Sequence, residues 1–255
     1  MHPVLAIVAF AGGVYAMGKG GAAVMAHGVH ATLVTGEMLL AAPSLVLLAL
    51  SGIPLGEGLG LKPVAARTAL LSAVAGATLW AASLGLMNVQ FVLWRPPAEY
   101  LDYFRALHQL LRPQTLGEGI LSLLAIALMP ALCEETVFRG VVLPSFARAG
   151  PVIGLLGSSV LFALIHIDPL GRSVVFHRLP FAFAVGLGLG ALRLLTGSLV
   201  ASMVAHAVLN TITFATVFLS GAASEAMEEP QALSGILLLL GGGAATAWLF
   251  RALRR

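Results

Sequence analysis

The stretch "LLAIALMPALCEETVFRGVVLP", residues 123–144, places two adjacent glutamates and an arginine inside an otherwise apolar run. A transmembrane helix needs roughly 20 mostly apolar residues, and this run is long enough to be one. An ionisable side chain at membrane depth is costly unless it is paired or faces water. Glu134, Glu135 and Arg139 are therefore candidate functional residues, provided that the run lies in a membrane.

The composition of the chain indicates a membrane protein. Of its 255 residues, 59% are hydrophobic and 10% are charged, whereas a soluble domain is about 25% charged. The net charge is +3, but the basic residues are scattered between apolar runs, as in loops beside a bilayer. This pattern does not suggest a nucleic-acid partner. Cys133 is the single cysteine, which excludes an internal disulfide.

Apolar runs predict an all-α, polytopic membrane protein with about eight transmembrane helices in a single membrane domain, residues 1–255. The start of the chain lacks a basic region before its apolar run, so we expect a retained first span there and not a cleaved signal. The candidate spans lie near residues 3–18, 29–51, 66–94, 116–147, 150–167, 173–195, 198–220 and 232–250.

Residues 97–111, "PAEYLDYFRALHQLL", have a different pattern. Tyr100, Phe104, Leu107 and Leu111 fall on one face of a helix, and charged residues fall elsewhere. Such an amphipathic helix is suited to lying in the membrane interface. An ordinary surface connector is an equally good interpretation of the same pattern.

The orientation in the membrane is weakly determined by the sequence. The basic tail at 251–255 and the acidic loop at 224–230 favour cytoplasmic termini. With that choice Arg95, Arg105 and Arg112 fall on the far side, which argues against it. The sequence does not decide between the two orientations.

The pattern "CEETVFRG" divides the two glutamates. At 100° per residue, Glu135 and Arg139 are one helical turn apart and about 40° around the axis, in the favourable order for an ion pair. Glu134 points about 140° away from Arg139. We therefore expect Glu135 to be structural and Glu134 to be the better base. The alternative is that both glutamates only bind neighbouring helices.

Two further segments carry polar residues at membrane depth. In "SSVLFALIHID", 158–168, Phe162 precedes His166 by one turn. In "TGSLVASMVAHAVLNTITF", 196–214, His206 and Asn210 share one face, and small residues around them permit close helix packing. A lone intramembrane histidine is often only a hydrogen-bonding residue between helices, so His166 taken alone does not indicate catalysis.

The three patterns E-E-x-x-x-R, F-x-x-x-H and H-x-x-x-N occur in this order on three predicted helices. Together they resemble the CPBP family, which comprises the CAAX proteases and bacteriocin-processing enzymes and is also called the Abi family. The resemblance covers residues 116–220 and implies a catalytic core there. It implies an intramembrane endopeptidase in a prokaryotic cytoplasmic membrane, acting on a membrane-anchored or lipidated protein or peptide.

The resemblance also implies roles for individual residues. Glu134 and His166 would activate water, and His206 and Asn210 would stabilise the oxyanion. Glu135, Arg139 and Phe162 would support them. No cofactor is needed for this chemistry.

Two alternatives remain at this stage. The ligand set Glu134, His166 and His206 could hold Zn²⁺ in a metalloprotease on the same scaffold, although the H-E-x-x-H signature is absent. The second alternative is a non-enzymatic membrane protein that binds a partner or confers immunity to a bacteriocin.

Overall fold

The computed structural model describes residues 2–170, 173–219 and 229–254. Within these ranges, seven helices are long and apolar enough to cross a membrane. The chain is thus an all-α, polytopic integral membrane protein, as the sequence predicts. The seven candidate spans are Pro3–His27, Val29–Leu50, Ala66–Leu93, Leu116–Ala149, Leu179–Thr196, Leu199–Val217 and Ala232–Leu253.

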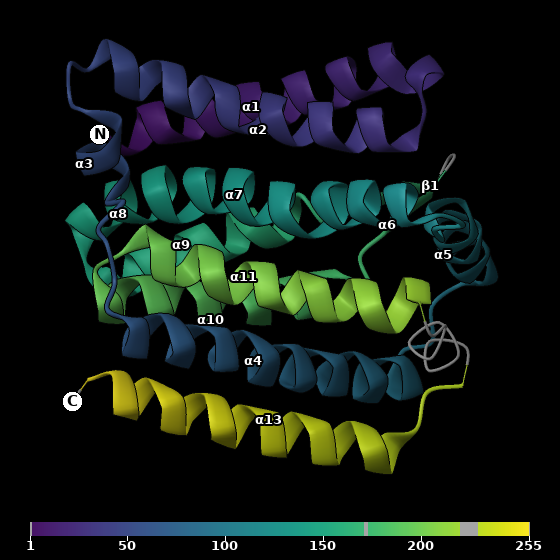
Figure 1. Cartoon of the computed structure of the whole chain (residues 1–255). Helices are drawn as coiled ribbons and strands as arrows, with labels where there is room; N and C mark the ends of the chain where they lie inside the picture. Colours follow the sequence, from purple (N-terminus) through teal and green to yellow (C-terminus); the bar gives the residue numbers. More distant parts are fainter. Residues whose placement is uncertain (1, 171–172, 220–228, 255) are drawn as a thin grey trace.

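Two helix pairs form opposite sides of the bundle (Figure 1). On one side, α1 (Pro3–Val24) is followed by η1 (Met25–His27) and packs along α2 (Val29–Leu50). On the other side, α13 (Ala232–Leu253) packs along α4 (Ala66–Leu93), which the short α3 (Leu55–Leu59) precedes. The remaining helices lie between these pairs.

The span at 116–149 is one long helix with changes of pitch. Its segments are α6 (Leu116–Leu123), the π-helical η2 (Leu124–Leu128), α7 (Met129–Glu135), the π-helical η3 (Thr136–Val142), α8 (Leu143–Phe146) and η4 (Ala147–Ala149). Pro130 and Pro144 each follow a π-helical segment within two residues. Because proline has no N–H and its ring clashes with the preceding turn, a wider turn there accommodates it. The glutamates thus end α7, immediately before η3.

The predicted span at 150–167 is shorter in the structure. Helix α9 covers Pro151–Leu164 and is not among the seven long spans. At 1.5 Å per residue its 14 residues extend about 21 Å, less than the roughly 30 Å of a hydrocarbon core. An antiparallel pair of three-residue strands follows, β1 (Asp168–Leu170) and β2 (Ser173–Val175), so the next helix begins at Leu179 and not at the predicted 173.

Helices α10 (Leu179–Thr196) and α11 (Leu199–Phe214) are joined by a tight turn, and η5 (Ala215–Leu219) continues α11. Gly197 ends α10 with φ of 65°, a left-handed conformation that glycine adopts without strain. Ser198 then caps α11 by accepting a hydrogen bond from the Val200 amide at 3.2 Å. The sequence "TGSL" therefore fixes where α11 begins, and with it the position of His206.

Helix α5 (Ala98–Leu111) lies at the end of the bundle opposite the two chain termini (Figure 1). The structure thus has a helix at the predicted amphipathic segment. Tyr100 and Leu111, on its apolar face, are 1% and 3% exposed, so this face packs against protein. Its placement in the membrane interface stays a prediction. Most of the acidic loop at 224–230 lies outside the described residues.

The helix that carries His206 packs tightly on α4, as its small residues predict. Ala201, Ser202 and Ala205 are buried in α11. A Cβ atom on Gly76 of α4 would overlap the backbone carbonyl of Ala205. A residue without a side chain is therefore required at position 76 for this approach.

We expect Gly76→Ala to lower the melting temperature of the purified protein, because backbone atoms of α11 cannot yield to the added methyl group. Gly241→Ala on α13 is the matched control, since nothing lies within 4 Å of a Cβ atom built there. Alanine favours a helix by about 1 kcal/mol over glycine, so the control should melt at the same temperature or higher. Equal melting temperatures for the two variants would contradict the close contact.

Candidate active site

The predicted ion pair forms at the start of η3. The guanidinium of Arg139 donates to Oε1 of Glu135 at 2.9 Å and to the backbone carbonyl of Gly186 in α10 at 3.0 Å. Both charged side chains are 0% exposed. The guanidinium carbon also lies 4.5 Å from the ring centroid of Phe162, a cation–π distance. Arg139 thus ties together α7, α9 and α10.

His206 reaches both glutamates from α11. Its Nδ1 lies 3.0 Å from Oε1 of Glu135, and its Nε2 lies 3.7 Å from Oε2 of Glu134. The first contact is a hydrogen bond, and the second is too long for one. The sequence assigns Glu135 to Arg139 alone. In the structure Glu135 is shared between Arg139 and His206, so it also orients the imidazole.

The backbone hydrogen bond of His166 fixes the tautomer of its ring. Nδ1 lies 2.8 Å from the carbonyl oxygen of Phe162. A carbonyl oxygen can only accept, so Nδ1 carries the hydrogen and Nε2 of the neutral ring has a free lone pair. The Phe162 ring lies 4.8 Å from the imidazole by ring centroids. His166 is therefore held with a proton acceptor available on Nε2.

A cavity of about 390 Å³ collects the predicted reactive residues. Its lining includes Glu134, His166, His206, Asn210 and Phe162. Glu135 and Arg139 do not line it. Asn210 makes no side-chain hydrogen bond to the residues that the structure describes, so its amide is available to a ligand. Of the two adjacent glutamates, only Glu134 lines this cavity.

Residues 116–212 match the model of a protein family, type II CAAX prenyl endopeptidase Rce1-like. This segment of the chain is similar to the CAAX proteases. The match begins at residue 116, where the resemblance in the sequence also begins, and it contains the glutamate, histidine and asparagine motifs. Searches of the curated proteins and of the solved structures returned no match. Residues 1–115 and 213–255 lie outside the family match.

Helix α5 contributes part of the cavity wall. Phe104, Leu107 and His108 of α5 line the cavity. The sequence suggests a solvated position for His108, but in the structure the side chain faces this cavity, and burial lowers its pKa. A substrate entering from this end would pass α5.

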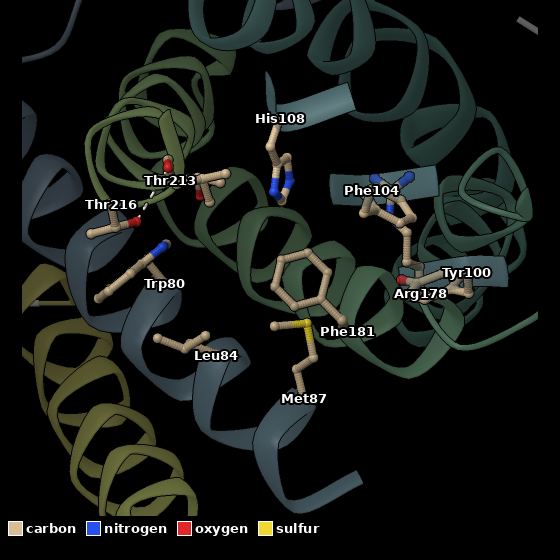
Figure 2. A pocket seen from close by; sticks show the side chains of 11 residues that line it. Trp80, Leu84, Met87, Tyr100, Phe104, His108, Arg178, Phe181, Thr213 and Thr216 are labelled. Atoms are coloured by element: carbon tan, nitrogen blue, oxygen red, sulfur yellow. Dashed lines mark hydrogen bonds between the residues drawn. The ribbon is translucent and has the colours of Figure 1, made fainter. Parts of the chain in front are cut away.

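A smaller chamber of about 150 Å³ shares lining residues with this cavity, and Figure 2 shows the side chains that line it. Phe104, His108, Arg178 and Phe181 line both spaces. Trp80, Leu84 and Met87 of α4 form the far wall of the chamber (Figure 2). Its lining is mainly apolar and aromatic, so it is suited to an apolar side chain of a peptide in the main cavity.

Glu37 of α2 also lines the main cavity, and it is not among the site residues predicted from the sequence. The signal for finding it is present in the sequence, because Glu37 is the one charged residue in the second span. It lacks a partner at helical spacing, and so it forms no motif. The cavity therefore contains two carboxyl groups, those of Glu37 and Glu134.

The described residues contain no group of three or more His, Cys, Asp or Glu side chains that could hold a metal ion. Glu134, His166 and His206 line one cavity, but they do not meet at ligand distances.

Proposed function

We propose that the chain is an intramembrane endopeptidase in which Glu134 and His166 activate water and His206 and Asn210 stabilise the oxyanion. The observation that carries this proposal is the shared cavity. Four side chains from three separate segments line it, while Glu135 and Arg139 stay outside its wall. A structural polar network would have no need of a cavity large enough for a peptide segment.

In the first step, water lies between the carboxylate of Glu134 and Nε2 of His166. Glu134 accepts a proton as the water oxygen attacks the scissile carbonyl carbon, while the lone pair on Nε2 orients the water. General base catalysis of this kind contributes typically 10²–10⁴-fold to the rate. Glu134 lies in a desolvated setting and has no arginine or lysine partner among the described residues. Both features favour general base catalysis by its carboxylate.

In the second step, the negative oxygen of the tetrahedral intermediate accepts hydrogen bonds from the Asn210 amide and from Nε2 of His206. Nδ1 of His206 is occupied by Glu135, so Nε2 can donate only from a doubly protonated ring. The hydrogen bond to Glu135 holds the imidazole at the cavity wall. Glu134 then delivers its proton to the leaving nitrogen, which breaks the C–N bond and restores the carboxylate.

Asn210→Ala is expected to lower kcat about 10²–10³-fold and to change KM much less, because an oxyanion donor acts mainly in the transition state. Thr211→Ala is the matched control, since Thr211 is on the same helix but does not line the cavity. Steady-state kinetics of both variants would check this. An effect of Asn210→Ala confined to KM would contradict the oxyanion role and indicate substrate binding instead.

A zinc-dependent hydrolase on the same scaffold is the second candidate. The observation in its favour is that both histidines have a hydrogen-bonded Nδ1, the arrangement that orients metal-ligating histidines. The observation against it is the missing three-ligand group in the described part of the chain. Water activation by Glu134 and His166 without a cation agrees with both observations.

We propose that the substrate is a membrane-anchored or lipidated protein or peptide in a prokaryotic cytoplasmic membrane. Quantitative sequencing of membrane-protein termini in cells with the active chain, with Glu134→Gln and without the chain would test the function. We expect new termini only with the active chain. Identical termini in all three samples would contradict the protease function and favour a partner-binding or immunity protein, provided that the active chain and the Glu134→Gln variant are present in equal amounts.

A further inference from the structure

The second helix brings an additional carboxylate to the catalytic cavity. Glu37 lines this cavity together with Glu134 and His206. Helix α2 packs against α7, the helix that carries Glu134. Oε2 of Glu37 is buried and has no hydrogen-bond partner among the described residues. This oxygen is thus inside the site and unsatisfied.

The contrast with Glu135 separates a structural from a ligand-binding carboxylate. Glu135 is held by Arg139 and His206, and it does not face the cavity. A buried acceptor with no donor costs about 1–3 kcal/mol. Glu37 has no such bonds at Oε2, so it does not stabilise the bundle through that oxygen. A donor brought by a ligand would remove this cost.

The residues around Glu37 favour one kind of hydrogen-bond donor on a ligand. Glu134 adds a second carboxylate to the same cavity, which favours a cation over a neutral group. The cavity also has basic side chains at His108, His166, Arg178 and His206, but none of them donates to Oε2 of Glu37. Leu33 and Ile126 supply apolar wall for the aliphatic stem of a long basic side chain.

We propose that Glu37 is a specificity-determining residue that accepts a hydrogen bond from a lysine or arginine side chain of the peptide held in the cavity. This inference rests on the proposed peptidase function and names a feature of its substrate. Helix α2 lies outside residues 116–212, the part of the chain that matches the family model. A site built to bind a polar group rejects analogues that lack it.

The first test needs no substrate. Butylguanidinium imitates an arginine side chain, and butanol is its neutral counterpart. We expect butylguanidinium to raise the melting temperature of the purified wild-type chain more than butanol does, and Glu37→Gln to abolish this difference. Glu57→Gln is the matched control, because Glu57 is an exposed glutamate in α3. Glu37→Leu tests folding, and it should melt at least as high as wild type, since it removes the unsatisfied oxygen.

The second test uses pairs of substrate peptides that differ by lysine or norleucine near the scissile bond. The wild-type chain should prefer the lysine peptide by roughly 30-fold in kcat/KM. This is the low end of the effect expected when one partner of a buried charge pair is removed. Glu37→Gln should bring the ratio close to one. The role of Glu37 would be overturned if Glu37→Gln left unchanged the kcat/KM ratio of the two peptides. It would also be overturned if this variant responded to butylguanidinium as the wild type does. Probe binding that depends on Glu37, with no cleavage by any variant, would keep the cation site and overturn the proposed peptidase.

Discussion

Glu134→Gln is expected to lower peptide cleavage about 10²–10⁴-fold in a protein that remains folded and inserted in the membrane. Glutamine has nearly the same shape as glutamate but cannot take a proton from water. Glu134 lines the cavity, and Nε2 of His206 lies 3.7 Å from its Oε2, beyond hydrogen-bond distance. Its loss should therefore remove the base without breaking a structural hydrogen bond.

The measurement is kcat/KM of purified variants on a peptide found by sequencing termini, together with their melting temperatures. Glu57→Gln makes the same chemical change at an exposed position in α3 and should cleave like wild type. Near-normal cleavage by Glu134→Gln would show that another group is the base. A large drop in melting temperature would show instead that Glu134 is structural.

The second large effect concerns stability. Glu135→Gln and Arg139→Met are each expected to destabilise the protein by roughly 3–5 kcal/mol, because each leaves a buried charge without its partner. Both side chains are 0% exposed and 2.9 Å apart. The double variant Glu135→Gln/Arg139→Met removes both charges, so it should be less destabilised than the sum of the single variants.

A double-mutant cycle of thermal melts would measure this coupling. Glu135→Gln should also weaken catalysis more than Arg139→Met at a temperature where both remain folded, because Glu135 also holds Nδ1 of His206. Additive losses in the cycle would contradict the ion pair. Equal activity of the two folded single variants would contradict the orienting role of Glu135.

Helical periodicity was sufficient to predict how the glutamates divide. Rotation of 100° per residue places Glu135 and Arg139 together and Glu134 apart, and the structure confirms the ion pair. Periodicity describes one helix, however, and carries no information about which helix stands opposite. The contact of His206 with Glu135 depends on how α11 packs on α7, and so it appears only in the structure.

The lengths of the spans were less predictable than their presence. The segment at 150–167 is as apolar as a spanning helix, yet α9 ends at Leu164. Pro169 disfavours a helical conformation at the residue before it, and β1 begins at Asp168. The π-helical turns before Pro130 and Pro144 produce no distinctive apolar pattern in the sequence, so the sequence does not predict them. Glu37 was missed because a single glutamate in a span shows no partner in sequence.

The most direct test of the central claim is to measure activity and metal content in one preparation. The claim is that Glu134 and His166 activate water for peptide hydrolysis without a metal ion. Protein purified and assayed in the presence of a chelator should contain far less than one zinc per chain and should cleave its peptide at the full rate. Loss of activity in chelator, recovery on adding Zn²⁺, and activity proportional to zinc content would contradict the account.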